Sequence, residues 1–461
     1  MHPLGFCLSL LLGLVSLPSL SPMQAAEKPH ILLIMADDLG WMDLHCQGNA
    51  LLDTPHLDQL ASEGIRFTDA YAAAPVCTPT RAAIMTGLSP ARLQITNHAP
   101  GNPEFVSPAT GLKGAPWTTY LSLAYDTLAE HLQRAGYRNG FVGKWHLSHH
   151  KGSDASGRLE PRLRPEFQGF DLNVGGCDYG GPPSYFAPYR NPALKDGPEG
   201  EYLPDRLANE CIAFLETPSE KPLFLCWWNY SVHYPIQAPQ DLIEKYQQRQ
   251  GVQRPAYYAM IEGMDRAIGK VLKHLETSGK ADETLVIFTS DNGSLFENLP
   301  LRANKGYLYE GGIRVPWIMR WPGEIKAGKT SSLPVISSDL FPTLLDVAGC
   351  ELSETDPLDG ESLKGWILGE IPLKRNALYF HYPNYAFHKN NRLGSAIRKG
   401  HHKLIHFYDD DSLELYDLEK DLAESKDLSA SSPELARALK LELDQWRQRT
   451  GAIAPTRIAL P

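Results

Sequence analysis

Short apolar runs recur along the chain and are separated by segments of helical periodicity. Residues 30–36 (HILLIMA), 223–228 (LFLCWW) and 284–289 (TLVIFT) are almost continuously apolar, and residues 139–142 form a shorter candidate strand. Runs of this length are typical of strands that are buried on both faces of a parallel sheet. We therefore predict that these four segments belong to one sheet.

Helical patterns lie between these runs. They occur at residues 55–63, 126–134 and 256–276, and the last is long and amphipathic. Gly136 closes the second helix, since glycine is favoured just past a helix end. Repeated strand–helix units imply a mostly parallel sheet with helices on both faces.

The hydrophobic pattern changes near residue 376. Four short strands and a final helix are predicted from there, at residues 377–381, 394–398, 403–407, 413–416 and 433–449. Successive short strands followed by a helix indicate a small antiparallel sheet that is packed by that helix. We expect a large α/β domain at residues 27–370 and a small α+β subdomain at residues 371–461, with the boundary in the region 355–376.

The N-terminal segment has the pattern of a secretory signal peptide at residues 1–26. Residues 8–17 are apolar, and small residues precede a cleavage site after Ala26, although no lysine or arginine occurs before residue 28. The apolar run is too short to span a bilayer as a stable helix, and no later stretch is long enough for a membrane span. The expectation is a periplasmic or secreted protein.

The amino-acid composition argues against several classes of function. Hydrophobic residues make up 43% and charged residues 21% of the 461 residues, as in a soluble globular protein. The net charge of −10 argues against nucleic-acid binding, although a pocket in an acidic protein can still be positive enough for an anionic substrate. Seven cysteines without regular spacing or a CxxC pair argue against a disulfide framework and a zinc site, but allow one bridge in an oxidising compartment.

Residues 77–81 read CTPTR where a helix is expected to begin. Pro79 suits a first helical turn, because its missing N–H would be unpaired there anyway. Helix N-termini attract anions, so a nucleophile at Cys77 with Arg81 in the same turn would face a sulfate or phosphate oxyanion. Taken alone, Cys77 could equally be a small buried hydrophobe and Arg81 a surface charge.

Polar residues follow two of the predicted strands directly. Asp37 and Asp38 come after the first strand, and Asp291 and Asn292 come after the strand at 284–289. Ligands of open α/β sheets bind beyond the carboxyl ends of the strands. Carboxylate and amide oxygens favour calcium or magnesium over zinc, and without a cation the gathered carboxylates would repel one another. Each pair alone could still be a cap or turn.

Several separated motifs occur together in this chain. They are Asp37-Asp38, residues 77–87, Gly143-Lys144-Trp145-His146, His233, Asp291-Asn292-Gly293, Lys305, residues 310–316 (EGGIRVP) and residues 414–418 (ELYDL). In this order the set resembles the type I, formylglycine-dependent sulfatases of the alkaline-phosphatase-like superfamily, and bacterial secreted arylsulfatases in particular. The resemblance covers nearly all of the chain beyond the signal. It departs at Asn139, where the family often has serine or threonine, a position that we interpret as structural.

The resemblance implies an α/β, alkaline-phosphatase-like fold, in which helices sandwich a large, mostly parallel sheet, with a small C-terminal antiparallel sheet plus helix. It implies that a formylglycine-generating enzyme or a cysteine-type sulfatase-maturating enzyme oxidises Cys77 to formylglycine. Residue 77 would then work as an aldehyde hydrate. The implied cofactor is one calcium ion rather than magnesium, and its ligands are Asp37, Asp38, the converted Cys77, Asp291 and Asn292.

The resemblance also assigns catalytic roles. The implied catalytic residues are Cys77, Arg81, Lys144, His146, His233, Asp291 and Lys305. Asp291 would remove the proton of the attacking hydroxyl, while Arg81 and the two lysines neutralise charge on the sulfuryl group. His233 would protonate the leaving alcohol, and His146 would deprotonate the second hydroxyl and so expel sulfate. Outside this context, His233 could be a satisfied core histidine.

The expected substrate is a sulfated carbohydrate. Candidates for contacts with its leaving group are Asn97, His98, Trp117 and residues 179–189 and 381–388.

One alternative is a phosphatase or phosphonate monoester hydrolase of the same superfamily. Another is a non-catalytic protein that binds sulfated glycans, if Cys77 stays unconverted. The CxPxR pattern favours sulfate over phosphate, and the two candidate histidines favour catalysis over binding alone.

Overall fold

The computed structural model describes residues 28–149, 161–351, 357–369 and 371–459. The predicted signal peptide at residues 1–26 lies outside these ranges, as does residue 370 at the predicted domain boundary.

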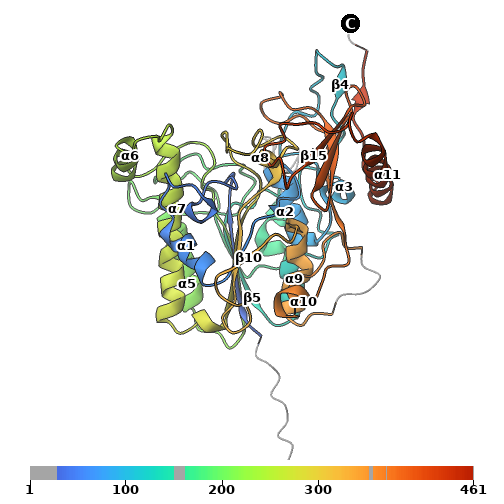
Figure 1. Ribbon diagram of the computed structural model, residues 1–461. Coiled ribbons are helices and arrows are strands. Elements are labelled where there is room, and N and C mark those ends of the chain that lie inside the picture. The colour runs from blue at the N-terminus through green and yellow to red at the C-terminus, as the bar shows by residue number, and fades with distance from the viewer. Residues whose placement is uncertain (1–27, 150–160, 352–356, 370, 460–461) are drawn as a thin grey trace, which may run out of the picture.

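An eight-stranded sheet forms the centre of the molecule (Figure 1). Its strands, in spatial order, are β10 (Lys329–Ser331), β2 (Ile65–Phe67), β9 (Trp317–Arg320), β8 (Thr284–Ser290), β1 (His30–Ala36), β7 (Leu223–Trp228), β5 (Arg138–Gly143) and β6 (Leu172–Val174). β9 runs antiparallel to both of its neighbours, and the other adjacent pairs are parallel. The predicted mostly parallel sheet is therefore confirmed.

Helices cover both faces of this sheet (Figure 1). One face carries α1 (Pro55–Ser62), α5 (Leu203–Glu216), α6 (Gln240–Gln247) and α7 (Pro255–Thr277), and the other carries α2 (Cys77–Thr86), α4 (Leu128–Arg134), α9 (Leu340–Val347) and α10 (Lys364–Gly369). β1 lies in the middle, with Leu32 and Ile34 in the core below the first group and Leu33 and Met35 in the core below the second. This explains why its sequence is apolar from Ile31 to Ala36. Burial of each large side chain among them stabilises the fold by about 1.5–3 kcal/mol.

A second sheet follows near the C-terminus. β12 (Ala377–Tyr382), β13 (Gly394–Lys399), β14 (His402–Phe407) and β15 (Leu413–Asp417) form an antiparallel meander, and α11 (Pro433–Thr450) packs on it. One side of the meander joins a core with Tyr71 and Ile313, which precede it in the chain, and the other joins a core with Leu443 and Trp446 of α11. The predicted small antiparallel sheet plus helix is confirmed (Figure 1).

Shorter elements complete the fold. They are β3 (Ala70–Tyr71), β4 (Leu112–Lys113), β11 (Val335–Ile336), β16 (Thr456–Arg457), α3 (Pro90–Leu93), α8 (Glu310–Ile313) and the 3-10 turns His45–Gln47, Pro161–Leu163, Pro165–Phe167, Ala281–Glu283 and Ser337–Asp339. All six cysteines of the described residues are unpaired. Among those residues, none of the helices combines the length and apolar character that crossing a bilayer requires.

Candidate active site

The predicted metal ligands meet at the carboxyl ends of the central strands. Asp37 and Asp38 directly follow β1, Asp291 directly follows β8, and Cys77 is the first residue of α2. One ligand atom from each of these four residues lies within 4.8 Å of the others, and all four side chains are buried. The structure therefore brings together groups that are 40 to more than 200 residues apart in the sequence.

Two residues of the site have left-handed backbone conformations. Asp38 has φ 64° and His146 has φ 57°, a region that residues other than glycine rarely adopt. The Asp38 amide donates to Asp291 Oδ1 at 3.1 Å, and the amide of Asp37 donates to Ser231 O at 2.8 Å. These contacts hold a conformation that is unfavourable on its own, as is common where a side chain must be aimed at a ligand.

Three cations neutralise the three carboxylates. Lys144 Nζ bonds both oxygens of Asp37, at 2.9 and 2.7 Å. Lys305 Nζ lies 2.7 and 2.8 Å from the oxygens of Asp38. Arg81 donates from Nε and Nη2 to Asp291 Oδ2 at 2.9 and 2.6 Å. When all three carboxylates are ionised, the charges of these six groups cancel, and a bound divalent cation would leave the site with a net charge of +2, which suits a sulfate or phosphate oxyanion.

The carboxylates do not titrate alike. Burial raises the pKa of Asp37 to about 8, and the nearby charge of Asp291 adds to this shift while Lys144 opposes it. Burial acts on Asp38 in the same direction, but the charges of Lys305 and Lys144 outweigh it and hold the pKa of that carboxyl below its usual range. Such splitting is what crowded carboxylates show when they are not sharing a cation.

The residues present fit a hard divalent cation. Asn292 donates from Nδ2 to Asp38 Oδ1 at 2.7 Å, while its Oδ1 is buried and has no partner among the described residues. A buried carbonyl oxygen without a partner is unfavourable and calls for a ligand. With Asp37, Asp38 and Asp291, this oxygen completes a set of the kind that calcium and magnesium take.

Cys77 is a weak nucleophile as a thiol. Its Sγ lies 3.6 Å from Asp37 Oδ1 and 3.8 Å from Asp38 Oδ1. Burial raises the pKa of this thiol far above its usual range, and the charge of Asp291 adds to the shift. The thiolate is the reactive form of cysteine, so this environment disfavours ordinary cysteine chemistry.

Glycine places Lys144 against the sheet. Gly143 ends β5 with φ +108°, and a Cβ at this position would lie 1.9 Å from Trp228 O. The next amide, that of Lys144, donates to the same carbonyl at 2.8 Å. The chain can turn toward the carboxylates here only because residue 143 has no side chain.

Both predicted histidines lie at the cluster as neutral imidazoles. Burial lowers the pKa of His146 well below its usual range, and burial together with Lys305 lowers that of His233 to about 3. His146 Nε2 donates to Ala99 O at 2.7 Å, so Nδ1, 3.4 Å from Thr78 Oγ1, is the acceptor. His233 Nε2 lies 3.7 Å from Asp38 Oδ2.

Thr78 contacts the predicted catalytic histidine His146, and it was not identified from the sequence as a residue of the site. Its hydroxyl faces His146 and also accepts the amide of Ala99 at 3.1 Å. It thereby links the start of α2 to the segment that fixes the histidine ring. Nothing in the CTPTR motif distinguishes this threonine from Thr80, whose hydroxyl bonds Ala74 instead.

The predicted leaving-group residues divide into two sets. Asn97 and His381 are buried and engaged within the protein, since Asn97 donates to Tyr385 O and His381 contacts Ser395 Oγ and Ile453 O. We therefore remove both from the candidate set.

The other candidates, except Trp117, include residues near the site. Gly180 and Gly181, in the predicted segment 179–189, lie against the rings of His146 and His233 respectively. His98 and residues 387–388 lie beside Lys305. Trp117 packs on Gly101 instead.

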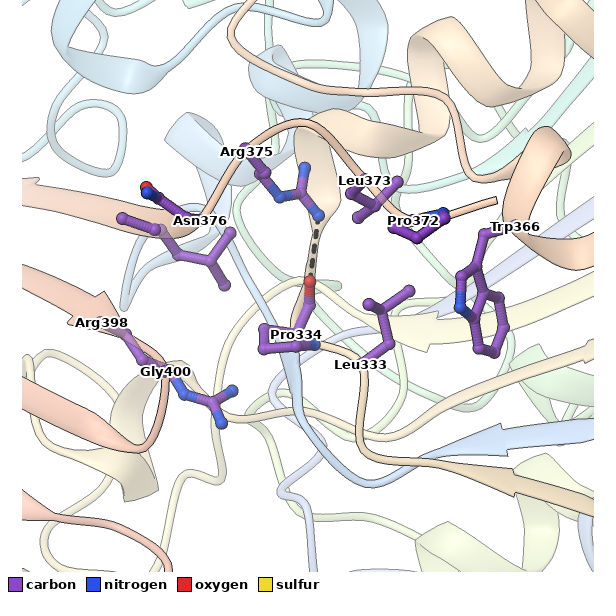
Figure 2. Close-up of a pocket in the computed structure, with 11 residues that line it drawn as sticks. Leu333, Pro334, Trp366, Pro372, Leu373, Arg375, Asn376, Arg398 and Gly400 are labelled. Carbon is purple, nitrogen blue, oxygen red and sulfur yellow. Dashed lines mark hydrogen bonds between the residues drawn. The ribbon is translucent and has the colours of Figure 1, made fainter. Parts of the chain in front are cut away.

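A cavity of about 310 Å³ lies apart from this cluster (Figure 2). Leu333, Trp366 and Leu373 form its apolar walls, and Arg375 donates to Pro334 O at 3.0 Å beside them. It contains none of the predicted catalytic residues. This cavity therefore does not mark the chemistry of the protein.

Comparisons with known proteins agree with the site. A family model described as Sulfatase matches residues 29–350, and one described as N-sulphoglucosamine sulphohydrolase, C-terminal, matches residues 303–449. Human arylsulfatase A is 33% identical, over 91% of this chain and 87% of its own length. Mouse N-acetylgalactosamine-6-sulfatase is 32% identical, over 77% and 69%.

A solved structure extends the similarity to three dimensions. Ps i-CgsB in complex with k-i-k-neocarrahexaose superposes with a TM-score of 0.76 at 29% identity, covering 91% of this chain and 93% of its own. The match to the Sulfatase model spans well over half of the sequence. The chain belongs to the sulfatase family, the hydrolases of sulfuric esters.

Proposed function

We propose that this sulfatase acts on sulfated carbohydrates, with a hydrated formylglycine made from Cys77 as nucleophile and one calcium ion as cofactor. The observation that carries the proposal is the position of Cys77. It opens α2, and its Sγ lies 3.6 Å from a carboxylate oxygen, while burial raises the pKa of its thiol above the usual range. An aldehyde hydrate at this position would supply the oxygen nucleophile that the thiol cannot.

The conversion needs a partner protein. A formylglycine-generating enzyme or a cysteine-type sulfatase-maturating enzyme would convert the Cβ–SH group to a C=O group, with a two-electron oxidant that the enzyme supplies, an oxygen from water and release of the sulfur as hydrogen sulfide. Water would then add to the aldehyde to give two hydroxyls. Only 1% of the surface of Cys77 is exposed in the folded chain. The partner must therefore act before α2 is buried.

The cation would be held by Asp37, Asp38, Asp291, Asn292 and residue 77. When bound, it would lower the pKa of a hydroxyl on residue 77 and polarise a sulfate oxygen. The oxygen-only donor set supports calcium, and magnesium is the second choice.

In the first step, Asp291 takes the proton of one hydroxyl of residue 77, whose oxygen attacks sulfur. Arg81, Lys144 and Lys305 stabilise the charge that develops on the sulfuryl oxygens. The bond between sulfur and the leaving oxygen breaks as His233 donates a proton to that oxygen. Because its pKa is low in the free site, His233 must gain this proton when the anionic substrate binds.

In the second step, His146 takes the proton of the remaining hydroxyl through its unprotonated Nδ1. A C=O bond forms on residue 77, the bond between its carbon and the sulfate oxygen breaks, and sulfate leaves. A serine at this position could not complete the cycle this way, since it has one hydroxyl only.

The names of the relatives support a carbohydrate substrate. One is an N-acetylgalactosamine-6-sulfatase, and the solved structure of another holds a neocarrahexaose. The apolar run at residues 8–17 supports export to the periplasm or the medium. We also propose that the chain divides into its two domains in the region 355–376, ahead of β12.

The proposal is tested by assaying 4-nitrophenyl sulfate with protein made in the presence and in the absence of a maturating enzyme. Turnover is expected only with converted, calcium-loaded protein, and removal of calcium by a chelator should abolish it. Equal turnover by the unconverted protein would contradict the proposed nucleophile. Faster hydrolysis of 4-nitrophenyl phosphate than of the sulfate would favour the phosphatase alternative.

A further inference from the structure

Phe387 is an exposed aromatic residue beside the charged cluster. Its surface is 53% exposed, although most large apolar side chains of the described chain are buried. Its ring centroid lies 5.6 Å from Lys305 Nζ, the ammonium that bonds Asp38. An apolar ring is thus held at the edge of the site, where a leaving group attached to sulfate would emerge.

The loop that carries this ring is fixed in place. His388 Nε2 donates to Lys305 O at 3.2 Å, and the amide of Asn390 donates to His388 Nδ1 at 3.0 Å. The amide of Ala386 donates to Asn391 Oδ1 at 2.8 Å. A platform that is ordered before the ligand arrives binds it at a smaller entropic cost.

A hydrogen-bond acceptor lies next to the ring. The amide group of Asn97 donates from Nδ2 to Tyr385 O, so its Oδ1 is the acceptor toward His98 Nδ1, at 3.0 Å. His98 Nδ1 therefore carries the hydrogen, and Nε2 keeps its lone pair. The rings of His98 and Phe387 are 6.5 Å apart and perpendicular. An apolar face and a hydroxyl-accepting nitrogen are thus side by side.

We propose that Phe387 and His98 form the binding site for the leaving group, and that this group is a pyranose ring. The C–H face of the sugar packs on Phe387, and one of its hydroxyls donates to His98 Nε2. A simple aryl leaving group satisfies the aromatic contact alone, so the pair of contacts selects the carbohydrate. The inference rests on the proposed function and adds the residues that recognise the sugar.

The experiment compares an aryl sulfate with pyranose sulfates. Converted, calcium-loaded protein is assayed with 4-nitrophenyl sulfate, N-acetyl-D-galactosamine 6-sulfate, D-galactose 4-sulfate and D-glucosamine 6-sulfate, with sulfate release as the readout. We expect turnover of the aryl sulfate and of at least one pyranose sulfate. For that sugar, Phe387→Ala should raise KM about threefold to tenfold with little change in kcat, and Phe387→Trp should restore it.

Phe167 provides a matched control. It is also 53% exposed, lies on a 3-10 turn away from the cluster, and Phe167→Ala should leave every kinetic constant unchanged. His98→Ala should lower kcat/KM for the sugar at least about fivefold more than it lowers that for 4-nitrophenyl sulfate, because only the sugar has the hydroxyl.

The outcomes distinguish a failure of the proposed sugar-binding site from a failure of the proposed function. Turnover of 4-nitrophenyl sulfate without turnover of any pyranose sulfate overturns the inference and leaves the proposed function intact. Equal effects of Phe387→Ala and Phe167→Ala also overturn it. No turnover of any sulfate by protein with confirmed formylglycine and calcium contradicts the proposed function itself.

Discussion

Two buried clusters of this protein have the same charge composition but different surroundings. The catalytic cluster comprises Asp37, Asp38, Asp291, Arg81, Lys144 and Lys305, and the clamp cluster comprises Asp69, Glu310, Glu424, Arg314, Arg398 and Lys403. Each cluster thus pairs three carboxylates with three cations. Only the catalytic cluster is joined by a candidate nucleophile, two histidines and an exposed aromatic ring.

The clamp cluster ties the two sheets together. Lys403 of β14 lies 2.9 Å from both Glu310 of α8 and Glu424. Arg314 bonds Glu310 at 3.0 Å, and Arg398 of β13 bonds Asp69 of the large domain. These contacts join the segment that follows Lys305 to the C-terminal sheet.

The comparison shows that burial and shifted pKa values do not by themselves mark an active site. The pKa of Glu310 is about 2 and that of Glu424 about 7, a splitting of the kind also seen at Asp37 and Asp38. What distinguishes the catalytic cluster is its position at strand ends and at a helix start, together with the unpartnered Asn292 Oδ1. Ion-pair networks that only hold structure perturb pKa values as well.

The largest difference between the two clusters is expected from Cys77→Ser, at the catalytic cluster. This variant should lose multiple turnover of 4-nitrophenyl sulfate by about a thousandfold or more, because one hydroxyl cannot expel the bound sulfate. Intact-protein mass spectrometry should detect a trapped sulfuryl group on the variant. Cys350→Ser, at another unpaired cysteine, should retain full activity. Steady-state turnover by Cys77→Ser at the wild-type rate would contradict the aldehyde mechanism.

Asp291→Asn should give the next largest effect. It removes a metal ligand and the proposed base while keeping the shape of the side chain, so kcat/KM should fall about a hundredfold or more. Inductively coupled plasma mass spectrometry should show loss of calcium. Asp265→Asn is the control, since Asp265 is equally buried but accepts the backbone amides of His56 and Leu57. A variant at residue 291 with wild-type calcium content and rate would show that the site is misplaced.

Lys403→Met should affect stability and not chemistry. It leaves two buried carboxylates without their shared cation, so the free energy of unfolding should fall by about 3–5 kcal/mol. Denaturant titration measures this, and kcat of the folded variant should be unchanged below its unfolding temperature. Lys399→Met removes a half-exposed pair with Glu442 and should change stability by less than about 1 kcal/mol. A large loss of kcat in folded Lys403→Met protein would show that the two clusters are coupled.

The smallest effect concerns the pH dependence of stability. Burial raises the pKa of Glu424 to about 7 against the opposing charge of Lys403, while the unfolded chain keeps the ordinary value near 4.5. Between these values the unfolded chain releases a proton that the folded chain retains, so stability should fall by about 1–3 kcal/mol as pH rises from 4.5 to 7. Glu310, whose pKa is depressed, loses its contribution only as pH falls below this window.

Glu424→Gln isolates this contribution. The variant should show a flatter pH dependence of stability between pH 4.5 and 7, while Glu419→Gln, at an exposed residue, should keep the wild-type slope. Identical slopes for Glu424→Gln and the wild type would show that this carboxyl is not protonated in the folded protein.

The sequence predicted the strongly patterned parts of the fold. The continuous apolar runs at β1 and β7 gave strand bounds that the structure matches residue for residue. β2 and β9 were not predicted, because runs of three and four residues with an arginine carry too little signal. α5 was also not predicted, although its apolar positions have helical spacing.

The candidate site was predicted as a set of residues and not as an arrangement. The ion pair between Lys305 and Asp38 joins positions 267 apart in the sequence, so no local pattern could reveal it. Asn97 was placed among the leaving-group contacts because its amide suits a sugar. The structure shows that this amide instead orients His98, which only the folded chain could reveal.

The most direct test of the account is mass spectrometry of the tryptic peptide at residues 67–81, from protein produced in its own host. The account predicts formylglycine at position 77, in protein that turns over sulfate esters. Unmodified cysteine at position 77 in protein that is fully active would contradict it.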